Sequence, residues 1–399
     1  MSKLLTDTND FPTSLPRRAL RSLLFRVGLT RFLGDRRWRT VSAAPYIHTL
    51  YRRPGTMFAG MSTRFEDPVY DALIGRDSAR WAAQEDVITA IDDCWVEPDR
   101  CLIIGPDGSL VAQSLPHRLK ALYPSTFGYA RRRSGAARIE EALVYDGSAS
   151  TNYYHHLVEA VASLLLFIDY VGRPRDIPVI VNRWIHDSRF FADLRERSPL
   201  FASINWRVQE PGEWIHVDRA YRAHAIPFEA ERWRTIRALY GEVGKPAGRR
   251  IFLSRDSKRY TRGLSNEAEI VSLLERHGFE TVYAEHHSPV EQQRIFESAS
   301  HLVALQGMGL IQQMFMDPDS AHILEIMPSD RLQSEYYWQG WTLGVRYYDV
   351  ITGSGMGSDG KYRVDPARVE QAVDQMLAHP AGKRRYGCEV IDDKPQFSR

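Results

Sequence analysis

The sequence predicts an α/β fold in which parallel strands alternate with helices. Short apolar runs bounded by turns alternate with amphipathic segments over residues 249–328, and a similar alternation runs over residues 152–220. Buried strands that alternate with helices form parallel sheets, and their crossovers are right-handed. Residues 241–248 contain glycines and a proline and are the predicted linker between the two regions. A chain of 399 residues is therefore expected to form two α/β domains with extensions.

Composition limits the class of protein. Hydrophobic residues make up 43% and charged residues 26% of the chain, which is ordinary for a globular protein. A net charge of +2 argues against a protein built as a whole to coat nucleic acid. Cys94, Cys101 and Cys388 have neither metal nor disulfide-framework spacing, so reduced cysteines are the simpler expectation. No signal peptide or membrane-spanning segment is predicted, and we expect a cytoplasmic protein.

Residues 1–60 are predicted to be a basic N-terminal extension. Leu20, Leu23, Leu24 and Val27 follow the spacing of one helix face. A basic, partly amphipathic helix suits an anionic membrane surface, such as the inner face of the plasma membrane. An equally weighted alternative is a helix that packs on the body of the protein with solvated arginines. The arginines are Arg17, Arg18, Arg21, Arg26, Arg31, Arg36, Arg37 and Arg39.

Residues 61–243 are predicted to form the first α/β domain. Residues 65–98 show no clear period. A Pro-Asp-Gly turn at 106–108 between apolar runs predicts a β-hairpin. The other predicted elements are a helix at 152–170, a strand at 177–181, a helix at 185–197 and strands at 206–208 and 215–220.

Residues 244–350 are predicted to form the second α/β domain, followed by a C-terminal helix and tail at 351–399. Asp365 ahead of a proline predicts the start of a helix at 366–379, and the polar tail from Pro380 is expected to be loosely held. The predicted strands are 251–253, 281–283, 301–305 and 322–327, and the predicted helices are 266–277, 289–299 and 310–316.

Charged and glycine-containing segments follow two of these strands. Ser254-Arg255 ends one strand and leads to Arg262, while residues 306–310 form a glycine turn that opens a helix. Ligands bind beyond the carboxyl ends of parallel strands, and arginines beside a helix start hold phosphate. The sequence therefore predicts a nucleotide-phosphate site, against the alternative of a surface charge cluster with Asp256, Lys258 and Arg259. The residues assigned to this site are Ser254, Arg255, Arg262, Asn266, Gln306, Gly307, Met308, Gly309, Leu310 and Glu325.

Two further acidic groups lie in this part of the sequence. Glu325, near the end of the next strand, is predicted either to accept hydrogen bonds from a ribose diol or to pair with an arginine. Asp317-Pro318-Asp319 is explained more simply as a turn than as a metal ligand set. No metal site is predicted.

His155 and Glu159 lie four residues apart and share one face of the predicted helix. A carboxylate can fix the tautomer of a histidine, and such a histidine can act as a general base near neutral pH. Glu159 itself is the alternative base. The structural alternative is a helix start that Asn152 caps, with His155 buried and hydrogen-bonded.

Together these motifs resemble glycosyltransferase family 61, whose bacterial members are often labelled capsular polysaccharide biosynthesis proteins. The family's upstream motif Asn-Tyr-Tyr-His-x-Leu-x-Glu is similar to residues 152–159. The resemblance covers residues 145–350 and departs from the family in its glycine turn, where Gln306 replaces a histidine and Met308 an alanine. The downstream matches are Ser254-Arg255, Arg262, Asn266-Glu267, Gly278-Phe279-Glu280, Glu291-Gln292, Gln306 to Leu310 and Glu325 to Pro328.

The resemblance implies a GT-B-like fold of two Rossmann-like domains that face a cleft. The C-terminal domain would hold the nucleotide sugar, and the N-terminal domain would supply the base, His155 or Glu159, with Asn152 and His156 on the acceptor side. The implied activity is an inverting, metal-independent hexosyl or pentosyl transfer, most simply from a UDP-sugar. The acceptor would be an oligosaccharide or lipid-linked glycan in surface or capsular polysaccharide synthesis.

No cofactor, metal or nucleic-acid partner is expected for such an enzyme. Two alternatives remain open. One is a catalytically weakened glycan- or nucleotide-binding protein, which Gln306 and Met308 motivate. The other is a protein that associates with membranes or nucleic acid through its basic arm.

Overall fold

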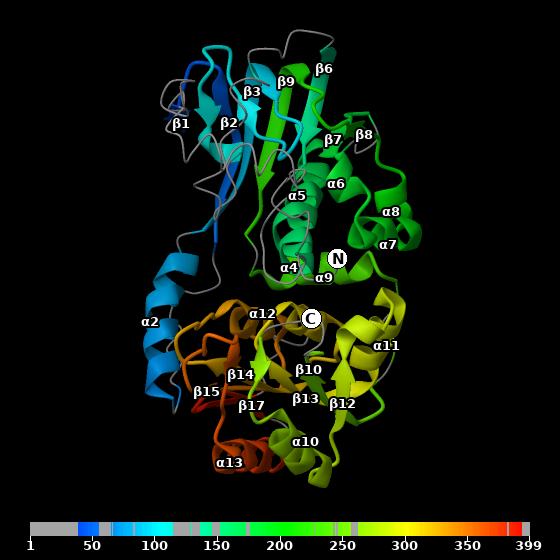
Figure 1. The fold of residues 1–399 in the computed structure, drawn as a ribbon. Coiled ribbons are helices and arrows are strands. Elements are labelled where there is room, and N and C mark those ends of the chain that lie inside the picture. The colour runs from blue at the N-terminus through cyan, green and yellow to red at the C-terminus, as the bar shows by residue number, and fades with distance from the viewer. Residues whose placement is uncertain are drawn as a thin grey trace. The chain divides into compact units, whose positions relative to one another are not determined.

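The computed structural model describes residues 39–55, 65, 67–82, 84–114, 129, 136–145, 152–172, 176–226, 228–241, 244, 246–256, 262–380 and 383–392. The predicted basic helix therefore lies outside the described residues. The chain is a mixed α/β protein that divides into two compact units, each described by itself (Figure 1). The first unit takes its described residues from 8–54 and 85–227, and the second takes them from 55–84 and 228–399.

The first unit contains a mixed nine-stranded sheet in the order β1-β5-β4-β3-β9-β6-β7-β8, with β2 paired to β3. Strands β6, β7, β8 and β9 form parallel pairs, whereas the pairs of β3 with β2, β4 and β9 are antiparallel. The predicted hairpin is confirmed, because β4 and β5 pair antiparallel across the Pro-Asp-Gly turn. The strands are β1 Thr40–Val41, β2 Ile47–Pro54, β3 Glu85–Val96, β4 Ile103–Ile104, β5 Leu110–Val111, β6 Ala137–Val144, β7 Val179–Asn182, β8 Trp206–Gln209 and β9 Ile215–His224.

A long helix in the first unit confirms the prediction for residues 152–170. It consists of α4 Tyr153–His155, a π-helical stretch His156–Val161 and α5 Ala162–Val171, and it ends at Gly172 in the left-handed conformation. In the described part of the chain, this is the one helix long and apolar enough to cross a membrane by length and composition. Two thirds of its most apolar window, 67%, is buried inside the protein, as in a core helix.

The single helix predicted over 185–197 is instead two helices, α6 Arg183–His186 and α7 Arg189–Arg197, followed by α8 Pro199–Ala202. The break has a local cause. The side chain of Asn182 accepts a hydrogen bond from the backbone of Ile185 at 2.8 Å. The side chain of Ser188, just before α7, accepts one from the backbone of Phe191 at 3.3 Å. Two N-caps six residues apart begin two helices.

The second unit contains a seven-stranded sheet in the order β12-β10-β13-β14-β15-β17-β18, parallel except for the pairing of the last two strands. All four strands predicted for this region are confirmed. The tail that was predicted to be loosely held instead supplies β17 and β18, because its Arg384 is buried and pairs with Asp319 at 2.6 Å. The strands are β10 Arg249–Ser254, β12 Glu280–Tyr283, β13 Ala299–Leu305, β14 His322–Pro328, β15 Tyr347–Gly353, β17 Lys383–Tyr386 and β18 Glu389–Asp392.

Helices surround this sheet, and a small parallel pair, β11 Gly263–Leu264 and β16 Lys361–Tyr362, lies beside it. The predictions of α10 Glu267–Arg276, α11 Pro289–Ser298 and α13 Pro366–Leu377 are confirmed. Asp365 caps α13 as predicted, accepting from the backbone of Ala367 at 3.0 Å. The helix predicted after the glycine turn is a 3-10 helix, η6 Met308–Phe315. The remaining helices are α2 Pro68–Ala82, α9 Ala230–Ala238, η5 Ala284–His286 and α12 Glu335–Leu343.

Helix α2 belongs to the second unit although it is flanked in sequence by β2 and β3 of the first (Figure 1). Just before the helix, the carboxylate of Asp67 accepts from Thr352 at the end of β15 and from Arg368 at 3.2 Å. Asp77 accepts from Ser334 at 2.6 Å, and the ring of Phe65 packs edge-on against Tyr337 at 5.1 Å. The segment for which the sequence showed no period thus supplies a helix to one unit and a strand to the other.

Candidate active site

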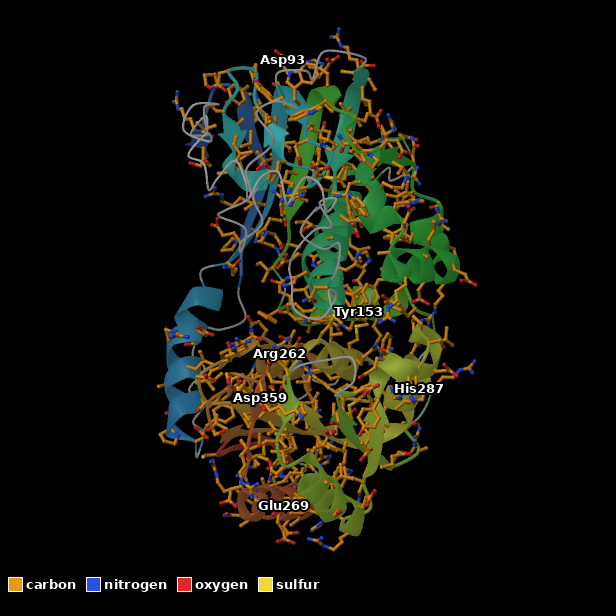
Figure 2. All side chains as sticks on the ribbon, in the orientation of Figure 1. Asp93, Tyr153, Arg262, Glu269, His287 and Asp359 are labelled. Atoms are coloured by element: carbon orange, nitrogen blue, oxygen red, sulfur yellow. The ribbon has the colours of Figure 1, made fainter. Side chains whose placement is uncertain are left out.

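A pocket lies at the carboxyl ends of the parallel strands β10, β13 and β14 in the second unit. It is small and partly open to solvent. This is the edge at which parallel sheets bind ligands. The residues that line it are Arg255, Arg262, Gly263, Leu305, Gln306, Pro328, Met356 and Tyr362. Figure 2 labels Arg262 in this unit.

Arg255 follows the last residue of β10 and reaches across the sheet edge to the glycine turn after β13. Its Nη2 donates to the backbone carbonyl of Gln306. A Cβ on Gly307 would overlap the Arg255 guanidinium, so a glycine is required at this position for the arginine to lie where it does. The arginine after β10 and the glycine after β13 are therefore linked by one contact, between the Arg255 guanidinium and the glycine turn.

Arg262 lines the same pocket, just before β11. No acidic side chain among the residues that the structure describes forms an ion pair with it. Burial raises the pKa of Tyr362, and the nearby charges of Arg255 and Arg262 partly oppose that rise. The two guanidinium groups therefore act on the same buried phenol. Two cations in a partly buried pocket favour an anionic ligand, and guanidinium groups match the oxygens of phosphate.

Gln306 is the third polar side chain of the pocket and is only 7% exposed. Its backbone N–H donates to the carbonyl of Ile326 at 2.8 Å, which continues the parallel ladder beyond β13. Its side-chain Nε2 donates to Oε1 of Gln333. The residue is thus held by its backbone and by its side chain.

Five other residues assigned to this site hold its walls rather than line it. Ser254 donates to Glu267 in the first turn of α10, and the Asn266 side chain exchanges hydrogen bonds with the backbone of Val364 at 2.9 and 3.3 Å. The others lie in η6. Leu310 is fully buried, and a Cβ on Gly309 would meet Leu253. Met308 is half-buried at the start of the 3-10 helix and is not among the lining residues.

Glu325 lies in the middle of β14 and is fully buried. Its Oε2 accepts from the hydroxyl of Tyr348 at 2.8 Å, and no described residue donates to Oε1. Burial raises the pKa of Glu325 to about 8, although the Tyr348 hydrogen bond opposes the shift. The described contacts of Glu325 include no arginine, and Glu325 is not among the residues that line the pocket. They therefore support neither the predicted ion pair nor the predicted ribose contact.

The pocket also contains residues that the sequence did not single out. Tyr362 and Met356 come from the segment assigned to the C-terminal helix and tail, and they reach the pocket because β16 pairs with β11 beside Arg262. No short-range signal announces this pairing, because two strands of two residues each lie almost a hundred positions apart. Pro328, which ends β14, could have been found from the strand-end rule.

His155 and Glu159 lie in the first unit, where the α-helical start passes into the π-helical stretch. His155 Nδ1 and Glu159 Oε1 are 2.7 Å apart, and the side chains are 12% and 21% exposed. In a neutral ring whose Nδ1–H donates to the carboxylate, Nε2 is an acceptor, and no described group hydrogen-bonds to it. The pair therefore has the arrangement of a general base whose tautomer is fixed by a carboxylate.

The neighbours of this pair have structural surroundings. Asn152 caps the helix, with Oδ1 accepting from the backbone of Tyr154 at 2.9 Å and of His155 at 3.4 Å. His156 is fully buried beside Tyr145 and Phe191, and no described residue hydrogen-bonds to either ring nitrogen. Burial lowers the pKa of His156 to about 4. The structure therefore places the ring of His156 in the core.

Other charged groups have local partners. Asp317 caps its own turn, and Asp256 pairs with His286 at 3.0 Å. Within the described ranges, no group of three histidine, cysteine or acidic side chains is placed to hold a metal ion.

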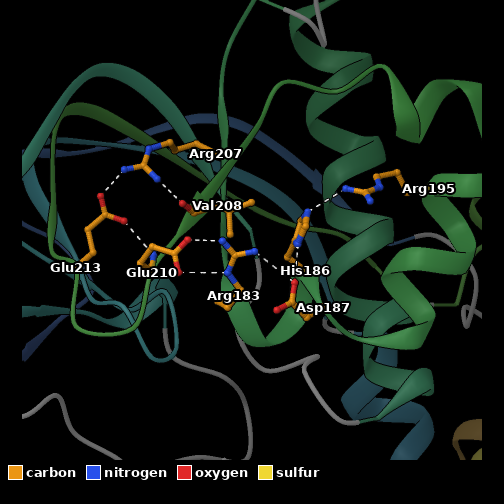
Figure 3. A network of polar contacts seen from close by, with 8 residues as sticks. All are labelled: Arg183, His186, Asp187, Arg195, Arg207, Val208, Glu210 and Glu213. Atoms are coloured by element: carbon orange, nitrogen blue, oxygen red, sulfur yellow. Dashed lines mark hydrogen bonds and ion pairs between the residues drawn. The ribbon is translucent and has the colours of Figure 1, made fainter.

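A network of polar contacts at β8 and after β7 joins Arg183, His186, Asp187, Arg195, Arg207, Val208, Glu210 and Glu213 (Figure 3). Its ion pairs are largely exposed, and exposed ion pairs contribute little to the stability of the fold.

The candidate residues thus form two groups in two units. The arginine pocket belongs to the second unit, and the His155–Glu159 pair belongs to the first, which also holds Tyr153 (Figure 2). Each group has internal geometry suited to its predicted chemistry.

The comparisons with known proteins agree with a glycosyltransferase. The family model described as Glycosyltransferase 61 matches residues 153–323, which include the His155–Glu159 pair, both arginines and the glycine turn. The match supports the resemblance seen in the sequence and, with it, glycosyltransferase activity on a nucleotide-sugar donor and a glycan acceptor in general terms. No curated protein matches the chain.

Proposed function

We propose that this protein is an inverting, metal-independent glycosyltransferase that takes a hexosyl or pentosyl group from a nucleotide sugar, most simply a UDP-sugar. The observation that carries the proposal is the pocket at the carboxyl edge of the second sheet, where Arg255 and Arg262 lie together. The family match over residues 153–323 supports it. A GT-B-like arrangement is part of the same proposal, with the first unit on the acceptor side and the second unit on the donor side.

The role of the arginines follows from the leaving group. When the glycosidic bond to the diphosphate breaks, negative charge grows on the departing phosphate oxygens. Two guanidinium groups beside those oxygens stabilise that charge more in the transition state than in the ground state. Arg255 is fixed by its bond to the Gln306 carbonyl, so it needs no reordering during the reaction.

The base follows from the acceptor. An acceptor hydroxyl must lose its proton as its oxygen attacks the anomeric carbon. Nε2 of His155 takes that proton, and Glu159, at 2.7 Å from Nδ1, stabilises the imidazolium that forms. Attack on the face opposite the diphosphate inverts the anomeric configuration.

The cellular setting is proposed from the sequence. Synthesis of a surface or capsular polysaccharide at the inner face of the membrane would give the basic segment that precedes β1 a function in holding the enzyme near a lipid-linked acceptor. Cytoplasmic donor sugars would then be accessible to the pocket.

Calorimetry with UDP, other nucleoside diphosphates and their sugars tests the proposal. Arg255→Ala and Arg262→Ala should each weaken binding of the diphosphate by about 10- to 100-fold, because a charged hydrogen bond contributes about 1.5–3 kcal/mol. Arg276→Ala, at an exposed arginine of α10 in the same unit, is the matched control and should bind as the parent does. Unchanged affinity in both pocket variants would refute the phosphate assignment.

A catalytically weakened binding protein is the second candidate, and Gln306 is the observation that favours it. Glutamine keeps a donor and an acceptor but cannot carry charge or transfer a proton. If the family's histidine were the base, Gln306→His should raise transfer by several orders of magnitude on a donor panel. We expect little gain, because His155 and Glu159 form a separate pair.

A further inference from the structure

The pocket of the second unit has two chemically different walls. Arg255 and Arg262 present only hydrogen-bond donors, whereas Gln306 carries both a donor and an acceptor. Which of these groups Gln306 turns toward a ligand depends on the partners that its amide already has.

One N–H of that amide is already engaged. Nε2 of Gln306 donates to Oε1 of Gln333. Among the groups that the structure describes, none donates to Oε1 of Gln306. This oxygen is also not among the fully buried atoms without a partner, so it remains accessible. The amide nitrogen keeps a second N–H, but the bond to Gln333 fixes the orientation of the amide and leaves Oε1 as the acceptor without a described donor.

Gln333 is itself held in place. The next residue, Ser334, is fully buried, and its hydroxyl donates to Asp77 of α2 at 2.6 Å. The backbone of Gln306 is held between Ile326 and Arg255. The orientation of the Gln306 amide is therefore set by two fixed segments.

We propose that Oε1 of Gln306 accepts a hydrogen bond from a hydroxyl group of the nucleotide sugar and so selects the donor, with Gln333 as its positioning residue. This inference rests on the proposed function of the same pocket. A phosphate oxygen facing Oε1 would place two acceptors together, so the phosphate belongs against the arginines. A sugar or ribose hydroxyl is a donor and fits beside the carbonyl, next to the diphosphate.

Deoxy ligands test this inference, and two arms separate the ribose from the transferred sugar. Calorimetry compares UDP with 2′-deoxy-UDP and 3′-deoxy-UDP, and compares each UDP-sugar that binds with its monodeoxy derivatives. The parent should bind one of these deoxy ligands about 3- to 10-fold more weakly, as expected for one neutral hydrogen bond. Gln306→Met keeps the length of the side chain and removes the acceptor. This variant should bind the natural ligand and that deoxy ligand equally. Its preference for the natural ligand over the other deoxy ligands should stay as in the parent.

Variants of Gln333 test the orientation. Gln333→Glu has only acceptors at its carboxylate, so it should keep the Gln306 N–H turned toward position 333 and preserve the discrimination. Gln333→Leu cannot accept and should lose it. Ratios of affinities are compared, because a charge at position 333 would weaken UDP and its deoxy forms alike.

The results distinguish failure of the Gln306 acceptor role from failure of the proposed function. Retained discrimination in Gln306→Met, or loss in Gln333→Glu equal to that in Gln333→Leu, would overturn the acceptor role while nucleotide binding stands. A parent that binds none of the nucleoside diphosphates or their sugars would overturn the proposed function and this inference with it.

Discussion

At the scale of single residues, burial separates two histidines that are adjacent in the chain. His155 is partly exposed and lies 2.7 Å from the Glu159 carboxylate, while His156 is fully buried with no described hydrogen-bond partner on its ring. Solvent reaches the first side chain, whereas burial keeps the second neutral at physiological pH by lowering its pKa to about 4.

His155→Ala should retain nucleotide binding and lose about 10²- to 10⁴-fold in transfer, the usual contribution of a general base. Glu159→Gln should show a similar or smaller loss, because it leaves the imidazole in place but removes its counter-charge. Transfer rates and calorimetry on the same preparations measure both quantities. His48→Ala is the control, since His48 forms an exposed pair with Asp92 at 2.9 Å in the same unit. Parental transfer by His155→Ala across the pH range would locate the base elsewhere.

His156→Leu should raise the free energy of unfolding by about 1–3 kcal/mol, because it removes a buried polar ring that has no described partner. Transfer should be unchanged if the residue is part of the core. Urea unfolding and a transfer assay test the two statements together. A loss of transfer with normal nucleotide binding would instead return His156 to the acceptor side.

At the scale of elements, the two edges of the second sheet differ. The carboxyl edge holds the arginine pocket, whereas the amino edge holds a stack of histidine rings. His301 near the start of β13 and His322 at the start of β14 are paired in register, with ring centroids 4.6 Å apart and planes 14° apart. His379 and Tyr347 pack against His322.

This stack should make the protein sensitive to acid. Burial, reinforced by neighbouring cationic groups, lowers the pKa of His301 and of His322 to about 4. The unfolded chain, with a histidine pKa near 6.5, then binds more protons than the folded chain between these values. Stability is therefore full above about pH 6.5 and is lost as the pH falls toward 4.

The test compares urea unfolding at pH 7 and pH 5. His322→Asn should lower stability at pH 7 but reduce the loss between the two pH values by about 1 kcal/mol, after allowance for solvent screening. His48→Asn, at an exposed histidine, is the control and should show the parental pH dependence. An unaltered pH dependence in His322→Asn would show that this stack does not carry the effect.

At the scale of the whole molecule, contacts and chain order divide the protein differently. The described residues between 55 and 84 pack with the second unit, although the strands on either side of them pair with each other in the first. The N–H of Gly55 donates to the carbonyl of Gln84 at 3.0 Å, so the two ends of this segment lie next to each other. A truncation within 55–84 would therefore damage both units.

The N-terminal extension is a separate target for truncation. Deletion of residues 1–38 leaves Arg39, whose carbonyl accepts from Leu110 at 2.8 Å, and β1, which pairs with β5. The truncated protein should lose co-sedimentation with anionic vesicles while it keeps transfer to a soluble acceptor, because the arginine run is gone. Zwitterionic vesicles are the control. Equal co-sedimentation of both forms would count against a membrane role.

Local patterns account for the parts of this protein that could be predicted. Strands β10, β12, β13 and β14 and helices α10, α11 and α13 announce themselves through apolar runs, helical spacing and N-caps, all within a few residues. The strand-end rule then predicted the pocket region from Arg255 and Gly307, because parallel strands bring their carboxyl ends to one edge.

The sequence by itself determined the α/β class, the second sheet and the residue types that carry the proposed chemistry, since these depend on short-range periodicity and on strand ends. Only the tertiary structure decided that α2 joins the second unit, that the tail adds β17 and β18, and that Tyr362 lines the pocket. It also decided that His156 and Glu325 are buried. These features come from pairings between residues far apart in the chain, and such pairings leave no period in the segments that make them.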